Sequence, residues 1–175
     1  MPSLALNALS LLLGSGLLAS VGAVTITLSN FGNGALCTGP VLLTCASIAP
    51  NACCDAGVIF DETLFQGLPP TGIGIVYSGS GCTGKATNTG YGLNLCLSRG
   101  GKGANWNQVS NSAKRDEKNC TRVLPSTLSI GNRTFNIFGD VPLEVSEDML
   151  SLFNNSRGIA EAPEVPPHFL PHELV

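Results

Sequence analysis

Residues 24–29 read Val24-Thr25-Ile26-Thr27-Leu28-Ser29, so apolar side chains alternate with small polar ones. A period of two is typical of a strand that buries one of its faces. Further strand candidates lie at 57–60, 72–77, 91–97 and 106–109. Turns rich in glycine and asparagine separate them, at 79–84, 88–90 and 99–103, and no helical period develops in this half. The sequence therefore predicts a mostly β protein, a disulfide-stabilised sandwich or barrel.

The C-terminal third carries a different pattern. Segments 127–130 and 133–138 flank Gly131-Asn132, which predicts a hairpin. Ser146 is predicted to cap one short helix that begins with acidic residues. One face of this helix is apolar and consists of Met149, Leu150, Leu152 and Phe153. The tail at 160–175 is acidic and rich in proline, and we expect it to be extended or disordered.

The N-terminus has the features of a secretory leader. Residues 1–28 contain no charged side chain, and the densest apolar stretch, 9–18, has the length of a signal-peptide core. Small residues at Val21-Gly22-Ala23 predict cleavage after Ala23, so that the mature chain begins at Val24. The alternative is a membrane anchor, although glycine and serine dilute the apolar run and no basic residue flanks it. We expect a secreted protein, extracellular or in the cell wall, with no membrane contact after cleavage.

Seven cysteines follow the predicted cleavage site. An oxidising secretory route would pair them, and an odd number leaves one unpaired or bonded to a second chain as a disulfide-linked dimer. Cys53 and Cys54 are neighbours, so each is expected to bond to a different partner. The sequence leaves open both the pairing and the identity of the odd residue. The candidates are Cys37, Cys45, Cys53, Cys54, Cys82, Cys96 and Cys120.

Two kinds of modification site agree with secretion. N-glycosylation sequons begin at Asn119, Asn132 and Asn154, all in the C-terminal half. Lys114-Arg115 is a dibasic pair in a polar segment, and it is either a processing site, cut after Arg115, or a solvated charge pair.

The predicted organisation has five parts. They are a signal peptide at 1–23, a cysteine-rich β domain at 24–110, a polar linker loop at 111–122, a hairpin with a short helix at 123–159 that packs on or follows the β domain, and the tail at 160–175. The net charge of −3 is small, and acidic residues interrupt the one basic cluster, so we expect no nucleic-acid partner.

One glycine-rich segment invites a catalytic interpretation. Gly79-Ser80-Gly81-Cys82-Thr83-Gly84-Lys85 matches a dinucleotide fingerprint and most of a phosphate-binding loop. Ala86 replaces the hydroxyl residue that would hold magnesium, and residues 87–92 are poor helix formers. We therefore predict a turn and no nucleotide cofactor.

Other reactive constellations are weak. The only histidines, His168 and His172, fall in the proline-rich tail with Pro171 between them, which argues against a metal site or a nucleophilic triad. The adjacent acids Asp61-Glu62 would point their carboxylates apart in a strand. We predict no catalytic residues, no metal and no cofactor.

Two resemblances can be stated on these residues. The leader, the Cys53-Cys54 doublet and the body rich in glycine, serine and asparagine resemble fungal small secreted cysteine-rich proteins. Hydrophobins have eight cysteines with two doublets, whereas this chain has seven with one. The segment from Tyr77 to Gly84 resembles a βγ-crystallin-like hairpin, which implies a Greek-key sandwich with Tyr77 packed over its own hairpin.

Three functional hypotheses remain. The first is an effector-like protein that binds a partner outside the cell, either cell-wall carbohydrate or a host protein. The second is a structural protein of the cell wall or surface, and the third is a small extracellular enzyme. Trp106 is predicted to lie in the core, and it would be a candidate for stacking on sugars only if it were exposed.

Overall fold

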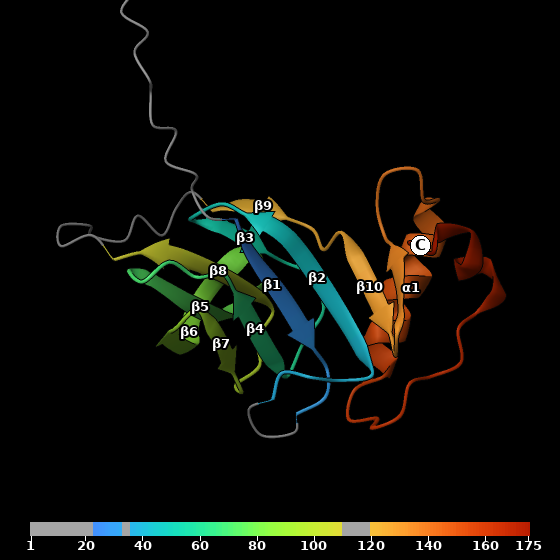
Figure 1. The fold of residues 1–175 in the computed structure, drawn as a ribbon, viewed down its shortest axis with the longest axis horizontal. Coiled ribbons are helices and arrows are strands. Elements are labelled where there is room, and N and C mark those ends of the chain that lie inside the picture. The colour runs from blue at the N-terminus through green and yellow to red at the C-terminus, as the bar shows by residue number, and fades with distance from the viewer. Residues whose placement is uncertain (1–22, 33–35, 110–119) are drawn as a thin grey trace, which may run out of the picture.

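The computed structural model describes residues 23–32, 36–109 and 120–175, and these form two β-sheets that face each other (Figure 1). The six-stranded sheet has the order β11-β10-β2-β1-β4-β7, with bounds Arg133–Asn136, Thr127–Ile130, Val41–Ile48, Val24–Ser29, Glu62–Gln66 and Asn94–Leu97. The five-stranded sheet has the order β6-β5-β8-β3-β9, with bounds Thr83–Tyr91, Gly72–Gly79, Gly103–Gln108, Ala52–Cys54 and Thr121–Val123. The predicted β-sandwich is confirmed.

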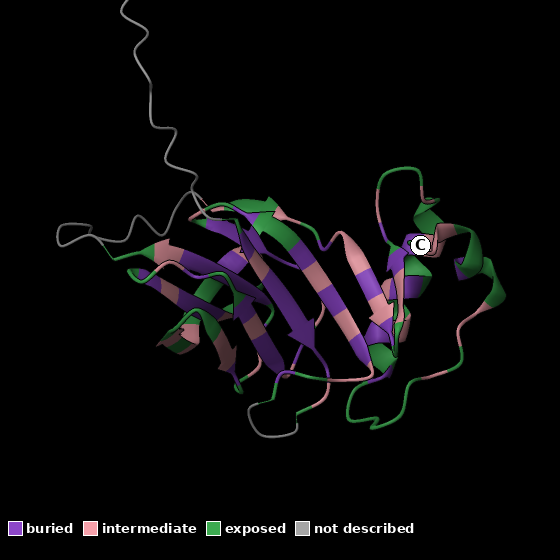
Figure 2. Cartoon of the chain, viewed as in Figure 1, coloured by how far each residue is buried: buried purple, intermediate pink, exposed green. Residues whose placement is uncertain are grey.

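Strand β1 occupies the centre of the six-stranded sheet, between β2 and β4. Val24, Ile26 and Leu28 are fully buried and point into the sandwich, as their alternation predicts. Figure 2 shows that nearly the whole of β1 is buried. Thr25, Thr27 and Ser29 point to the other face of the sheet, where Thr27 and Ser29 are also buried, so the prediction that this strand buries only one face was wrong. The hydrophobic period of this segment therefore fixed both its conformation and its register.

Several strands differ from the prediction. Segment 57–60 is not a strand, and only Phe60 forms an isolated bridge, to Gly101. Segment 91–97 was predicted as one strand, but the strand β7 begins only at Asn94. Strand β8 begins at Gly103, three residues before the predicted start at Trp106. Strand β6 covers residues that the sequence analysis predicted to be turns. It was missed because it is an edge strand whose residues are exposed or partly buried, so its sequence shows no hydrophobic period.

Helix α1 (Leu143–Asn155) begins three residues before the predicted cap. Pro142 precedes it, and the first helical hydrogen bond runs from the Ser146 amide to the Pro142 carbonyl. Ser146 is therefore inside the helix, where its buried hydroxyl donates to the Ile137 carbonyl. The prediction of the cap was wrong, but Met149 and Phe153 are buried as expected.

The tail contains regular secondary structure only beyond its first part. Residues 160–166 have no regular structure, and a 3-10 helix, η2 (Pro167–His172), follows. Phe169 is 1% exposed and packs edge-on against Phe135, with ring centroids 6.2 Å apart. The Leu174 amide donates to the Thr134 carbonyl, and Glu173 bridges to β11. The prediction of a disordered tail was wrong for these residues, because one aromatic anchor and a short backbone ladder hold the segment.

The core continues past the region where the two sheets face each other. The β10–β11 end of the six-stranded sheet is covered by α1 and η2 rather than by the second sheet (Figure 1). Met149, Phe153 and Phe169 pack there in one cluster with Leu128 and Phe135. Because β10 pairs with β2 and β9 pairs with β3, the C-terminal third is built into both sheets.

Candidate functional site

Three disulfides form, and they use the alternation of the Cys53-Cys54 doublet. Cys54 points into the sandwich and bonds to Cys45 on β2, so this bridge joins the two sheets. Cys53 points to the other side of β3 and bonds to Cys82. Cys37 bonds to Cys96 and holds the β1–β2 connection against β7. The presence of disulfides is confirmed.

Cys120 is the odd residue in the structure. It is partly buried immediately before β9, and the Asn105 amide Nδ2 donates to its sulfur at 3.4 Å. The sequence could not identify Cys120 as the unpaired cysteine, because that requires knowing which of the other six sulfurs lie close together in the fold.

Asp55 is the most densely bonded charged side chain at the edge of the five-stranded sheet. It is 0% exposed, and its carboxylate accepts from the Gly57 amide at 2.8 Å, the Ser80 hydroxyl at 2.6 Å and the Gly81 amide at 2.5 Å. Arg122 Nε lies 3.0 Å from Oδ2. The Asp55 carboxylate therefore ties β3, the β5–β6 connection and β9 together.

This contact explains the phosphate-loop resemblance of segment 79–85. The segment forms the tip of the β5–β6 hairpin through η1 (Ser80–Cys82), and strand β6 follows it instead of a helix. The Gly81 amide and Ser80 hydroxyl do bind an anion, which is the Asp55 carboxylate of the same chain. The donors that resemble a phosphate cradle are thus occupied internally.

The outer face of the five-stranded sheet carries both tyrosines of the chain. Ile73 on β5 lies opposite Tyr91 on β6 and Asn107 on β8. Val76 and Trp106 belong to the other, core-facing side, which places their alternating neighbours outside. We call this surface the tyrosine face, and its members are Ile73, Ile75, Tyr77, Thr89, Tyr91, Asn105 and Asn107, of which Ile75 and Asn105 are buried.

Side chains of the tyrosine face are uncharged and differ in exposure. Tyr91 is 62% exposed, whereas Tyr77 is partly buried and its hydroxyl donates to Asn105 Oδ1 at 3.4 Å. Asn105 is buried and in turn contacts Cys120, so it holds the Tyr77 hydroxyl from the neighbouring strand β8. Trp106 is fully buried and its indole donates to the Ile48 carbonyl at 2.8 Å. Trp106 is therefore a core residue, as predicted, and the alternative of sugar stacking by it was wrong.

A groove of about 410 Å³ lies between α1 and the tail. Leu152, Ile159 and Phe169 contribute its apolar floor, and His168 Nε2 lies 3.3 Å from Asp148 Oδ2 at its rim. Ser151 also lines the groove, but its hydroxyl accepts from Asn155 Nδ2 at 3.3 Å. The groove thus brings a serine, a histidine and an aspartate together, but Ser151 is bonded to Asn155 whereas His168 is bonded to Asp148.

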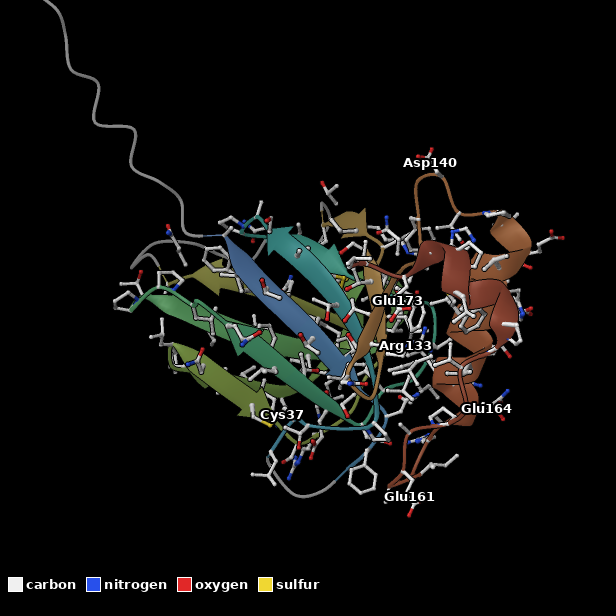
Figure 3. All side chains as sticks on the ribbon, turned by 45° about the vertical axis from the view of Figure 1, so that its right-hand side comes forward. Cys37, Arg133, Asp140, Glu161, Glu164 and Glu173 are labelled. Atoms are coloured by element: carbon white, nitrogen blue, oxygen red, sulfur yellow. A yellow bond between two sulfur atoms is a disulfide. The ribbon has the colours of Figure 1, made fainter. Side chains whose placement is uncertain are left out.

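The acidic residues Asp61 and Glu62, which are adjacent in the sequence, have different surroundings in the structure. Asp61 pairs with Arg157, and Glu62 is buried beside the Cys37–Cys96 disulfide, so the two adjacent acids do separate. The sulfurs and the Glu62 carboxylate lie within 4.8 Å, but the disulfide uses both sulfurs and leaves them unable to act as thiolate ligands. At the C-terminus, a hydrogen bond from Arg133 holds the pKa of Glu173 below its ordinary value (Figure 3).

Two of the three sequons fall on described surface. Asn132 is exposed in the turn between β10 and β11, and Asn154 is exposed in the last turn of α1. Asn119 and the Lys114-Arg115 pair lie outside the described residues, as does the predicted leader except for Ala23. Among the helices of the described segments, none has the length and apolar character needed to cross a membrane.

Fold and cross-links define a disulfide-stabilised β-sandwich whose surface features are an uncharged aromatic face and an apolar groove. A family model named ARB_05566_N, described as an N-terminal domain, matches residues 27–126. The match covers more than half of the chain, which therefore belongs to this family. It includes all seven cysteines and the whole five-stranded sheet, and it ends before β10. No curated protein and no solved structure matches the chain.

Proposed function

We propose that this chain is a secreted glycoprotein of the binding, effector-like class, and that the tyrosine face contacts carbohydrate outside the cell. The observation that carries the proposal is the placement of Tyr77 and Tyr91 on one outer sheet face, with the exposed Thr89 between them and the partly buried Asn107 beside them. Aromatic rings stack on the apolar faces of sugars, and amides and hydroxyls hydrogen-bond to their hydroxyl groups.

Spacing on the face suits an extended ligand. Tyr91 lies opposite Ile73, four residues before Tyr77 on β5. At about 3.3 Å per residue the two tyrosines are about 13 Å apart along the strand direction. An oligosaccharide laid along β5 and β6 would contact both rings and pass Thr89 between them. The face is uncharged, which favours a neutral polysaccharide over an acidic one.

Disulfides and sequons support the extracellular part of the proposal. Each disulfide typically adds about 2–4 kcal/mol by restricting the unfolded chain, and structural disulfides are found mainly in oxidising compartments. Exposed Asn132 and Asn154 are accessible for sugars on surfaces away from the tyrosine face, since they lie on the β10–β11 turn and on α1.

The test is retention on insoluble chitin, cellulose and β-1,3-glucan, each compared with uncoated beads. We expect one of these neutral polysaccharides to retain the protein, and Tyr91→Ala to weaken retention about fivefold, since an aromatic contact contributes about 1 kcal/mol. Leu93→Ala is the matched control, because Leu93 is 67% exposed but lies beyond β6. Failure of all three polysaccharides, or equal losses in the two variants, would refute the proposal.

A structural role in the cell wall or surface is the second candidate, and Cys120 is the observation that favours it. Its thiol makes no disulfide within the chain and is partly buried rather than enclosed. A bond between two such thiols, or to another wall protein, would fix the sandwich covalently. Non-reducing electrophoresis of the secreted protein tests this: a dimer that Cys120→Ser abolishes supports the structural role, and a monomer argues against it.

A further inference from the structure

The groove between α1 and the tail has the properties of a small-molecule site. Its volume of about 410 Å³ lies within the range of about 300–1,000 Å³ that is usual for ligand pockets. Two prolines, Pro163 and Pro166, form part of its wall. Because proline fixes its backbone φ, that wall has less conformational freedom than a chain without proline.

The floor of the groove is apolar and accessible. Ile159 is 43% exposed, and Leu152 is partly buried beside it. Phe169 closes the bottom and is held by Phe135 and by the helix. Covering Ile159 and Leu152 would remove apolar surface from water, which is the main source of affinity in such pockets.

The rim and its surroundings are acidic. Asp148 is the one carboxylate among the described residues that line the groove, and these include no lysine or arginine. Across residues 143–175 there are six acids and one arginine, and that arginine pairs with Asp61. Glu161 and Glu164 project from the tail that forms one wall (Figure 3). A ligand with a positive head is therefore favoured over one with a negative head.

We infer that the groove binds a small cationic amphiphile, whose apolar chain covers Leu152 and Ile159 and whose positive head pairs with Asp148. The charged head would replace His168 as the partner of the Asp148 carboxylate or join it there. This site is separate from the tyrosine face, which belongs to the other sheet, so the two proposals can fail independently.

The experiment uses two probes with the same decyl chain and head groups of opposite charge, decyltrimethylammonium and decyl sulfate. Each is used below the concentration at which it forms micelles. Binding to the full folded chain is measured by calorimetry and by chemical-shift mapping. We expect the cation to bind at least about fivefold more tightly than the anion, which corresponds to about 1 kcal/mol from the charged rim. The largest shifts are expected at Leu152 and Ile159. Equal affinity of the two probes, or shifts elsewhere, would overturn the inference.

Variants of the protein distinguish the contribution of the probe's charged head from that of its alkyl chain. Asp148→Asn is expected to lower the affinity for the cation about threefold to fivefold and to leave that for the anion unchanged or higher. Glu147→Gln is the matched control: it removes the same charge one residue earlier on α1, outside the groove lining. Ile159→Ser should weaken both probes, whereas Leu143→Ser, at the more exposed first residue of α1 and outside the groove lining, should weaken neither. An equal effect of Asp148→Asn and Glu147→Gln would show only general charge attraction and would refute the site.

Discussion

Replacing Asp55 tests the idea that one buried carboxylate holds three parts of the five-stranded sheet together. Asp55→Ala would remove the acceptor of the Gly57 amide, the Ser80 hydroxyl and the Gly81 amide, and the partner of Arg122. Hydrogen bonds to a charged group contribute about 1.5–3 kcal/mol each, but they are not additive, and some of the freed donors would be hydrated at the partly exposed hairpin tip.

The ion pair adds little to this sum, because the Arg122 side chain is 53% exposed and water screens it. Breaking a buried charged contact typically costs about 3–5 kcal/mol. We therefore expect Asp55→Ala to lower the free energy of unfolding by about 3–5 kcal/mol. Ser80→Ala removes one of the same donors and leaves the carboxylate bonded, so it should cost only about 1 kcal/mol.

Equilibrium unfolding in urea, with all three disulfides intact, measures both variants. Mass spectrometry after thiol alkylation establishes that the disulfides are unchanged. Asp55→Asn is a useful third variant, since it keeps the shape but has one acceptor oxygen, so its NH2 group must face either the Gly57 amide or the Ser80 and Gly81 donors, and it should cost more than Ser80→Ala. A loss below about 1 kcal/mol for Asp55→Ala would contradict the reasoning, and so would equal losses for Asp55→Ala and Ser80→Ala.

Two further outcomes follow from the C-terminal segment. Because Arg133 lowers the pKa of Glu173 from 4.5, this contact stabilises the folded chain above the unfolded pKa and loses its effect as the pH falls through the folded value; melting curves from pH 7 to 3 should therefore show a steeper decline for the parent than for Glu173→Gln. Phe169→Ala should cost about 3–5 kcal/mol and release the tail, because Phe169 is an enclosed core side chain. Limited proteolysis should then cut within 160–175, and an uncut tail with unchanged stability would contradict the anchoring role.

Segments with a clear period or a local turn signal could be predicted. The β1 alternation, the apolar run of β5 and the β10–β11 hairpin around Gly131-Asn132 are local features, and each formed where expected. Strand β6 could not be found, because an edge strand with glycine and threonine on both faces owes its extended form to its pairing with β5. The helix start failed for a similar reason, since the buried Ser146 hydroxyl found its acceptor at Ile137.

The candidate sites depended still more on three-dimensional placement. Tyr77 and Tyr91 are fourteen residues apart, and only the β5–β6 register puts them on one face. The Asp148–His168 contact needs the tail to return along α1, which the prolines of that segment did not reveal. Asp55 carries no sequence signal, because its donors come from a hairpin tip that lies far along the chain.

The amino-acid sequence alone determined that this chain is rich in strands, that Cys53 and Cys54 take different partners, and that one of the seven cysteines is left over. The strand content follows from the period of the apolar side chains, the different partners from the adjacency of Cys53 and Cys54, and the left-over cysteine from the odd count. Each of these is a local feature of the sequence or a simple count. Tertiary structure decided that Cys120 is the residue left over, that the glycine-rich hairpin tip binds Asp55, and that the tail packs against the core through Phe169. These outcomes required distant segments to meet, and the packing of the two sheets with α1 determines which of them do.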